Sequence, residues 1–274
     1  MRQGGGTDMA GGGKGAASGP RTSVWMAGKP APAPRRVDDQ GTGLDRQRIV
    51  AATIRLLDAE GIEKFSMRRL AAELGVTAMS VYWYVDNKDD LLEYVLDEIW
   101  AEVALPDLSD EGADWRAQLR SLAEAYRRCL AGHPWAPRLL GRYLNLGPRS
   151  MAFSNATLAV MNRSGVPQDR LTGALAALFH FVYGFCTIEG LYKERCRDAG
   201  VDEEEYFLNV MKVVSAGSDW AATYPAAAEV TESWTEAGSI QEMRERDFSV
   251  ALDTAIAGIE AMRNHPGNPG TTAP

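Results

Sequence analysis

The chain has 274 residues, of which 45% are hydrophobic and 24% charged, and its formal net charge is −8 at pH 7. This length accommodates a small domain and a larger one with its own core. No stretch approaches the ~20 apolar residues of a membrane span, and no apolar segment follows Met1 as in a secretion signal, so we expect a cytoplasmic protein without a membrane partner.

Residues 1–40 are rich in Gly, Ala and Pro. Such a composition cannot bury enough apolar surface to offset the entropy lost on ordering, so this leader is expected to be disordered. The same expectation applies to the polar Pro/Gly tail at 265–274. Asp8 is the only acidic residue among the first 37, and the basic residues there are Arg2, Lys14, Arg21, Lys29, Arg35 and Arg36.

The first predicted helix runs from Leu44 to Glu60. Its apolar side chains recur at helical spacing, at Ile49, Ala52, Thr53, Leu56 and Leu57. Asp45 suits the positive N-terminal end of the helix dipole, and Gly61 suits its end.

The stretch 66–88 predicts two short helices around a tight turn. Ser66 can cap the first helix with its hydroxyl, and Gly75 can adopt the left-handed conformation that ends it. Thr77 can cap the second helix, which is expected at 78–84. Two helices joined by a short turn with a glycine form a helix-turn-helix, whose second helix enters the DNA major groove.

The second of these helices carries aromatic side chains where a solvated helix would carry Lys, Glu and Gln. Val81 and Val85 can pack inward, which leaves the run Tyr82-Trp83-Tyr84. Successive residues on a helix point about 100° apart, so three in a row cannot all face one core. We expect some of these rings to pack inward and at least one to face outward, where it can contact phosphate or a thymine methyl group.

The run Ser80-Val-Tyr-Trp-Tyr-Val-Asp-Asn-Lys88, followed by Asp-Asp-Leu-Leu92, resembles the signature of the tetracycline-repressor (TetR) family of bacterial regulators. The specific part of the resemblance covers about residues 44–103, and a looser one continues to the C-terminus. It implies an all-α protein with a DNA-binding domain at 41–104 and an effector-binding and dimerisation domain at 105–264. In this family the helix that starts at Lys88 joins the two domains and moves like a lever.

The motif and the resemblance together predict a set of DNA contacts. The expected DNA-binding residues are Arg48, Arg68, Thr77, Ala78, Met79, Ser80, Tyr82, Trp83, Tyr84 and Lys88. The recognition helix lacks Arg, Gln and Asn, which predicts reading through methyl contacts, hydroxyls and DNA shape. Lys88 either meets a phosphate near the helix start or is a solvated lysine.

The charge of the chain does not exclude DNA as a partner, because only the docking face must be positive. Acidic side chains nevertheless outnumber basic ones between residues 44 and 104, which predicts modest non-specific affinity. The basic leader is either an arm that reaches the minor groove or phosphates, or an inert extension.

Beyond the motif, apolar periodicity predicts further helices and little strand. The helix after Lys88 is expected to reach about Val103. The others are expected at 114–131, 148–163, 171–195, 201–214 and 247–262. Residues 215–240 are rich in Gly, Ser, Ala and Thr and are expected to form a mobile loop over a ligand or a partner subunit.

No metal or other cofactor is expected. In the founding members of the family a histidine after the 114–131 helix helps to bind a magnesium–drug chelate, and His133 has a similar place. One imidazole without nearby carboxylates is a weak magnesium site, since magnesium prefers oxygen ligands. Cys129, Cys186 and Cys196 lack Cys-x-x-Cys spacing and are expected to be reduced core thiols.

The 171–195 helix is apolar nearly all round, which predicts burial both against its own domain and against a partner. His180, Tyr183 and Thr187 form a polar stripe on it. They are either hydrogen-bonded core groups or the polar contacts of a small-molecule pocket. The candidate ligand contacts are His133, Phe179, His180, Tyr183 and Thr187.

Helices 171–195 and 247–262 are expected to form a four-helix bundle between two copies of the chain. Ala255 and Gly258 are small enough to permit close helix approach. The candidate dimer contacts are Leu178, Val182, Phe185, Leu252, Ile256 and Ile259.

Taken together, these features predict a homodimeric transcription factor, expected to be a repressor that a small hydrophobic molecule releases from a palindromic DNA operator. The alternative is a helical small-molecule-binding protein or an enzyme that retains a vestigial motif. The three histidines stand in no catalytic or metal-binding spacing, which argues against an enzyme.

Overall fold

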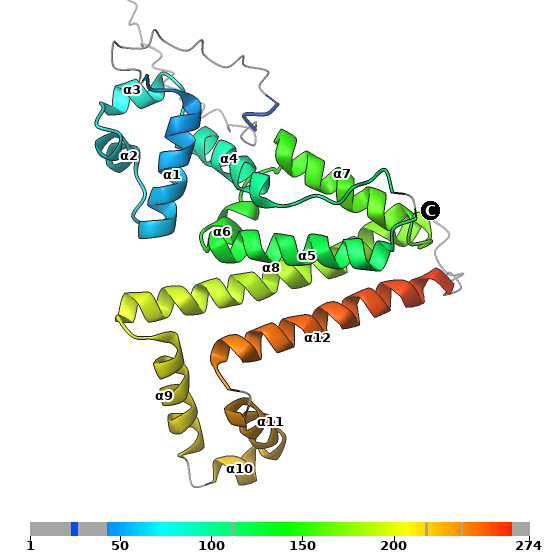
Figure 1. The fold of residues 1–274 in the computed structure, drawn as a ribbon. Helices are drawn as coiled ribbons and strands as arrows, with labels where there is room; N and C mark the ends of the chain where they lie inside the picture. The colour runs from blue at the N-terminus through cyan, green and yellow to red at the C-terminus, as the bar shows by residue number, and fades with distance from the viewer. Residues whose placement is uncertain (1–22, 27–42, 111, 217–218, 237, 265–274) are drawn as a thin grey trace, which may run out of the picture.

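The computed structural model describes residues 23–26, 43–110, 112–216, 219–236 and 238–264. Over these residues the secondary structure consists of α-helices and short 3-10 turns without a strand, which confirms the all-α fold class. The helices form a small N-terminal part and a larger C-terminal part, and α4 joins the two (Figure 1).

The small part consists of three helices, α1 (Arg46–Glu60), α2 (Met67–Glu73) and α3 (Ala78–Tyr82). Asp45, Ser66 and Thr77 cap them, each accepting a backbone N–H from the first turn of its helix. Gly75, between α2 and α3, has a φ of 68°, a conformation that costs glycine little. The expected tight turn is therefore present, although α3 is shorter than expected.

The connecting helix α4 (Lys88–Ile99) continues into a 3-10 turn at Trp100–Glu102. It contacts α1 in the small part, and α6 and α7 in the larger part. Asn87 caps its start by accepting the backbone N–H of Asp90 at 2.9 Å. A movement of α4 would therefore change packing contacts in both parts of the molecule.

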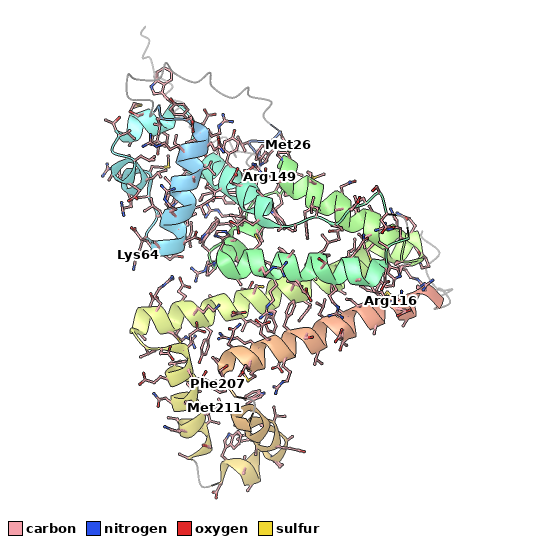
Figure 2. All side chains as sticks on the ribbon, viewed as in Figure 1. Met26, Lys64, Arg116, Arg149, Phe207 and Met211 are labelled. Atoms are coloured by element: carbon pink, nitrogen blue, oxygen red, sulfur yellow. The ribbon has the colours of Figure 1, made fainter. Side chains whose placement is uncertain are left out.

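Three long helices that contact one another pairwise form the larger part, α5 (Trp115–Gly132), α8 (Gln168–Ala199) and α12 (Ile240–Ala261). Two shorter helices, α6 (Ala136–Leu140) and α7 (Pro148–Asn162), contact α8 and α4. Arg116, at the start of α5, pairs with Glu260 near the end of α12. Figure 2 shows Arg116 where these two helix ends meet.

Two helical segments were not among the predicted helices. The helix α6 was missed because its few residues are too short for a periodic pattern. The expected loop at 215–240 contains α10 (Trp220–Thr223) and α11 (Pro225–Glu236), which corrects that expectation. Alanines after Pro225 favour a helix, and a proline at the first helical position sacrifices no hydrogen bond.

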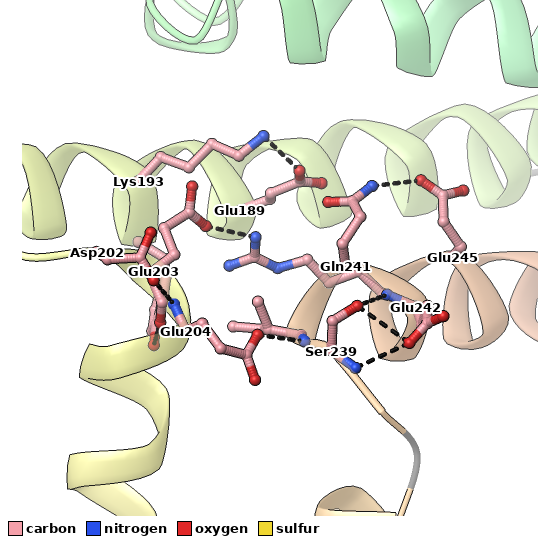
Figure 3. Close-up of polar contacts among 12 residues, drawn as sticks. Glu189, Lys193, Asp202, Glu203, Glu204, Ser239, Gln241, Glu242 and Glu245 are labelled. Carbon is pink, nitrogen blue, oxygen red and sulfur yellow. Dashed lines mark hydrogen bonds and ion pairs between the residues drawn. The ribbon is translucent and has the colours of Figure 1, made fainter.

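Helices α9 (Glu203–Ser215), α10 and α11 extend away from the rest of the molecule (Figure 1), and none of their described side chains is buried. Polar contacts attach α9 to the start of α12. Glu203 pairs with Arg244 at 2.6 Å, and Glu204 accepts the backbone N–H of Ile240 at 2.7 Å (Figure 3). The capping box at Ser239 then starts α12.

Residues 23–26 of the leader lie against α4, although the whole leader was expected to be disordered. The Ser23 hydroxyl and the Val24 N–H both donate to the Glu93 carboxylate, the latter at 3.2 Å. The Trp25 ring meets the Tyr94 ring edge-on, with centroids 5.1 Å apart. Trp25 supplies the apolar surface that the composition of the leader otherwise lacks. The other leader residues up to 40, and the tail at 265–274, lie outside the described residues.

Among the described helices, α8 alone is long and apolar enough to cross a bilayer by length and composition. The sequence was expected to contain no such segment. Because α8 contacts α5, α6, α7, α9 and α12, its apolar composition has a role in helix packing. The core helix of a helical bundle passes the same test.

Candidate nucleic-acid interface and ligand cavity

The outer surface of α3 presents large apolar and aromatic side chains to solvent. Met79, Tyr82 and Trp83 are 69%, 42% and 60% exposed. Val81 is fully buried and fixes the helix on the core of the small part. Exposed groups on the second helix of a helix-turn-helix are placed to contact bases and phosphates.

The hydroxyls of Thr77 and Ser80 lie 2.9 Å apart near the start of α3. Thr77 is exposed, whereas Ser80 and the neighbouring Ala78 are half-buried. Thr77 also caps the helix by accepting the backbone N–H of Ser80 at 3.2 Å. Each hydroxyl still has lone pairs to offer a base edge or a phosphate-bound water, because a hydroxyl is one donor and two acceptors.

Tyr84 does not belong to this surface. Its side chain is 9% exposed and packs in the same core as Val81 and Val85. Because α3 ends at Tyr82, the chain turns before Tyr84 and carries that ring inward. The assignment of Tyr84 to the DNA surface is therefore corrected, and two of the three consecutive rings point outward.

Basic side chains around α3 are only partly available to DNA. Arg48 on α1 and Arg68 on α2 are exposed. Arg69 is paired with Glu60 at 2.7 Å and with Glu73, and the hydrogen bond that it donates to Glu60 raises the pKa of Arg69.

Lys88, a candidate phosphate contact, is turned inward. Its Nζ donates to the Phe65 carbonyl at 3.0 Å and lies 5.1 Å from the centroid of the Phe65 ring. The lysine must leave this position to reach a phosphate, so a DNA contact by Lys88 stays a prediction.

A cavity of about 520 Å³ lies in the larger part, between the end of α4 and helices α5, α6, α7 and α8. Of the candidate ligand contacts, Phe179, His180 and Tyr183 line it. The Tyr183 hydroxyl donates to the Pro137 carbonyl at 2.9 Å, which leaves its oxygen free to accept. The volume falls within the range of ligand pockets.

Thr187 and His133 are not among the residues that line this cavity, so their assignment as ligand contacts stays a prediction. The Thr187 hydroxyl donates to the Tyr183 carbonyl at 2.7 Å, within α8. His133 is buried at the junction of the two parts, with Nδ1 2.8 Å from Asp58 Oδ1 and Nε2 3.1 Å from Glu102 Oε1. The sequence could not show these carboxylates, because they come from distant helices.

The surroundings of His133 favour its charged form. Burial by itself lowers the pKa of His133, but hydrogen bonds and charges from Asp58 and Glu102 outweigh it and raise the pKa above its usual value. The Trp135 indole N–H also donates to Asp58, at 2.7 Å. A protonated His133 thus links the end of α1 to the end of α4.

Asp97 links α4 to the wall of the cavity. The Asp97 carboxylate on α4 is almost fully buried and accepts the backbone N–H groups of Arg149 and Ser150 at 3.1 and 3.0 Å. These N–H groups belong to the first turn of α7, whose Ser150 and Phe153 line the cavity. A ligand that displaces α7 therefore acts on α4.

The candidate dimer residues lie inside the single chain. Leu178, Val182 and Leu252 have no exposed surface, and Ile256 and Ile259 are also buried. The half-buried Phe185 packs on the Phe248 ring of α12, with centroids 5.3 Å apart. The five buried residues hold α8 and α12 to the rest of their own subunit, which corrects their assignment to a partner interface, whereas a partner contact by Phe185 stays a prediction.

Other sides of the same two helices carry exposed apolar residues. On α8, Ile188 is 71% and Leu191 48% exposed, and on α12 Val250 is 60% exposed. Side chains point about 100° apart per residue, so Val250 projects nearly opposite the buried Leu252. The exposed apolar residues of these helices therefore lie on sides other than those predicted to meet a partner.

Cys129, Cys186 and Cys196 are buried free thiols. Burial is the largest cause that raises the pKa of Cys129 and of Cys186, each to about 12. Within the described residues, no group of three or more His, Cys, Asp and Glu side chains is arranged to hold a metal ion.

Several residues of the cavity were missed by sequence reasoning. Trp100, Tyr126 and Phe153 line it, and they come from the end of α4, from α5 and from α7. The apolar periodicity of α5 indicates an inward side for Tyr126, but the pattern of one helix does not reveal which residues of another helix it meets. A tryptophan just past the last apolar turn of α4 was the available signal.

Comparison with known proteins supplies two matches to family models. The model described as "Bacterial regulatory proteins, tetR family" matches residues 49–95. The model described as "Tetracyclin repressor-like, C-terminal domain" matches residues 106–263, which is more than half of the chain.

The chain is also similar to individual regulators. It is 31% identical over 195 residues to an HTH-type transcriptional regulator of Saccharopolyspora erythraea, covering 68% of this chain and 82% of that protein. It is 32% identical over 194 residues to the HTH-type transcriptional repressor DrrR1 of Streptomyces coeruleorubidus, covering 69% of each. Among solved structures, the Streptomyces coelicolor TetR family protein ActR in complex with actinorhodin matches with a TM-score of 0.67 and 26% identity, covering 80% of this chain and 96% of that one.

Proposed function

The chain belongs to the TetR family of bacterial regulatory proteins, and we propose that it is a homodimeric repressor of transcription that a small molecule releases from a palindromic operator. The observation that carries this proposal is the connection between the exposed surface of α3 and the cavity through the single helix α4. DrrR1 is a repressor, and ActR has been crystallised with actinorhodin, which supports both halves of the proposal. We also propose that the protein acts in the cytoplasm, where its DNA lies.

DNA would be read by α3 and held by residues around it. Tyr82, Trp83 and Met79 supply contact with thymine methyl groups and sugar–phosphate, and Thr77 and Ser80 supply hydroxyls. Without a bidentate Arg, Gln or Asn on α3, part of the specificity comes from the shape of the DNA. Arg48 and Arg68 would contact phosphates and set the orientation of the domain.

Two copies would associate through the exposed apolar sides of α8 and α12. Ile188, Leu191 and Val250 are large exposed apolar residues on these two helices, and association would cover them. Isologous packing of these helices would make a four-helix bundle. It would place two α3 helices in successive major grooves, ~34–36 Å apart.

A ligand in the cavity would act by favouring a subunit arrangement in which the two α3 helices are wrongly spaced. Trp100 forms part of the wall at the end of α4, and Asp97 ties α4 to α7 on another side of the cavity. To shift the population from 1:99 to 99:1, the ligand must bind the released state more tightly by ~5.5 kcal/mol.

Selection of genomic DNA fragments by the purified protein, followed by footprinting, tests the proposal. The expected result is a short palindrome next to the gene of this protein or a divergent neighbour. Enrichment that disappears at moderate salt, with no footprint, would contradict sequence-specific binding and leave only non-specific attraction to phosphates.

A further inference from the structure

One short piece of the leader is anchored to the second turn of α4. The Glu93 carboxylate accepts the Val24 N–H at 3.2 Å and also the hydroxyl of Ser23, which is 2% exposed. Trp25 meets the next residue of α4, Tyr94, with ring centroids 5.1 Å apart and planes 82° apart. The Tyr94 ring is therefore held by the leader as well as by its own helix.

The Tyr94 ring in turn carries an arginine. The Arg46 guanidinium carbon lies 4.5 Å from the centroid of this ring. Arg46 is the first residue of α1, so the contact joins the start of α1 to α4. Trp25, Tyr94 and Arg46 thus form a stack of side chains from the leader, α4 and α1, here called the Arg46 stack.

This kind of contact leaves the hydrogen-bonding groups of the guanidinium available. A guanidinium uses its face to stack on an aromatic ring, whereas its N–H donors all lie in its plane. None of the described carboxylates forms an ion pair with Arg46. Arg69, by contrast, is paired with two carboxylates. A planar, unpaired guanidinium suits the oxygens of a phosphate, which it can bind in a bidentate way.

Arg46 also lies at the end of the small part where DNA is expected. In Figure 1 the start of α1 and the helix α3 lie at the same end of the small part. Phosphates flank the major groove that would receive α3, and basic side chains beside a recognition helix contact them. A DNA phosphate is therefore the ligand that this guanidinium suits.

We propose that docking of the leader on α4 positions Arg46 to bind a DNA phosphate, so that Trp25 strengthens operator binding without touching DNA. This inference rests on the proposed function, in which α3 reads the operator. A side chain that is already ordered loses less conformational entropy when it binds. Without Trp25 the Tyr94 ring loses one of its supports, and the guanidinium must be ordered when DNA binds.

The phosphate contact is tested by the salt dependence of binding. Fluorescence anisotropy measures the affinity of the full-length protein for its footprinted operator between about 50 and 200 mM salt. In Arg46→Ala each subunit loses one phosphate contact. The slope of log affinity against log salt should therefore become less steep by about 0.9 for each subunit.

Arg55→Ala is the matched control, because it removes the same charge from an exposed position of α1. Arg55 lies about 13 Å further along the helix, at a rise of 1.5 Å per residue. The control should keep the slope of the unmodified protein. An equal slope in Arg46→Ala and Arg55→Ala would overturn the phosphate contact.

The role of Trp25 is tested by a double-mutant cycle with Arg46. Trp25→Ala should lower operator affinity roughly fivefold or more, because both subunits of a dimer must then order Arg46 on binding. Its salt slope should stay close to that of the unmodified protein, since the guanidinium still reaches the phosphate. Trp25→Phe keeps a ring against Tyr94 and should retain most of the affinity.

In the Arg46→Ala background, Trp25→Ala should have little further effect, because the two side chains act through one contact. An equal loss in both backgrounds would mean that the leader acts on DNA by another route, which overturns the inference. Unchanged affinity in Trp25→Ala would overturn it as well.

Random-sequence duplex DNA separates this inference from the proposed function, since a phosphate contact does not depend on sequence. If no operator is found, but Arg46→Ala reduces the slope on random DNA and Trp25 is coupled to Arg46 there, the positioning role stands and the repressor proposal fails. If the operator is protected and Arg46→Ala leaves the slope unchanged, the positioning role fails and the repressor proposal stands.

Discussion

The Asp97 carboxylate of α4 accepts the backbone N–H of Ser150 at 3.0 Å and so caps α7 from another helix. This hydrogen bond connects the cavity to the small part of the molecule, since Ser150 lines the cavity and α4 contacts α1. Asp97→Ala should remove this cap and lower the free energy of unfolding by about 1–2 kcal/mol. It should also weaken the response of DNA binding to ligand. Urea unfolding and ligand titration of the operator complex measure the two effects, and a full ligand response in Asp97→Ala would contradict the role of this contact.

The contact between Asp97 and the start of α7 can also be tested by a substitution at Gly147, which precedes α7. A Cβ atom on Gly147 would lie 2.2 Å from the Asp97 carboxylate, so Gly147→Ala should push the carboxylate out of place. It should reproduce both defects of Asp97→Ala. Gly132→Ala is the control, because nothing lies within 4 Å of a Cβ at that position.

The raised pKa of His133 predicts a dependence of stability on pH. The folded protein binds this proton more tightly than the unfolded chain, so the contribution is complete below the ordinary histidine pKa of about 6.5. It should be lost as the pH rises through the raised value, by ~1.4 kcal/mol for each unit of difference between the two pKa values. The measurement is the free energy of unfolding between pH 5.5 and about 9.

His133→Gln should remove this pH dependence, because an amide does not titrate. His180→Gln changes an exposed histidine away from the carboxylate pair and serves as the control. Parallel profiles for the unmodified protein and His133→Gln would show that Asp58 and Glu102 do not hold the proton as the structure implies.

Tyr82 and Tyr84 should respond to substitution in opposite ways. Tyr82→Ala removes an exposed ring from α3 and should weaken operator binding by about 1–3 kcal/mol with little change in stability. Tyr84→Ala removes a buried ring and should destabilise the fold by about 3 kcal/mol or more. Operator titration and thermal unfolding of both variants distinguish the roles, and unchanged operator affinity in Tyr82→Ala would refute the contact.

Ile188 and Val250 test the proposed dimer. Ile188→Glu and Val250→Glu each place a charge on the exposed apolar side of α8 or α12, and should shift the protein toward monomer and weaken operator binding at low concentration. Sedimentation gives the oligomeric state. Val213→Glu is matched in exposure, since Val213 on α9 is 78% exposed, and should leave the dimer intact.

Local patterns in the sequence predicted much of the helical fold. Caps at Ser66 and Thr77 and a glycine turn at Gly75 are short-range features, so their chemistry is legible without the structure. The long apolar helix α8 was also predicted, with ends close to those observed. The helices at 220–236 were not, because a composition rich in small residues is shared by loops and by alanine-rich helices.

The surfaces of those helices were harder to predict. Leu178 and Leu252 were assigned to a partner because an apolar stripe does not indicate whether it faces its own subunit or another. His133 was assigned to a ligand because Asp58 and Glu102, its partners, are distant in the sequence. Trp100 escaped notice because residues from several separate helices build the cavity that it lines.

The rate at which reagents label the buried thiols can report internal motion of this protein. Cys129 on α5 and Cys186 on α8 lie where these two helices meet, and a pKa of about 12 keeps each sulfur protonated at neutral pH. Only the thiolate attacks a disulfide reagent, so labelling must wait until the helices separate and the sulfur reaches water. The rate of thiol labelling then reports how often the core of the larger part opens locally. Comparing this rate with and without a bound effector or operator shows which of the two suppresses the opening.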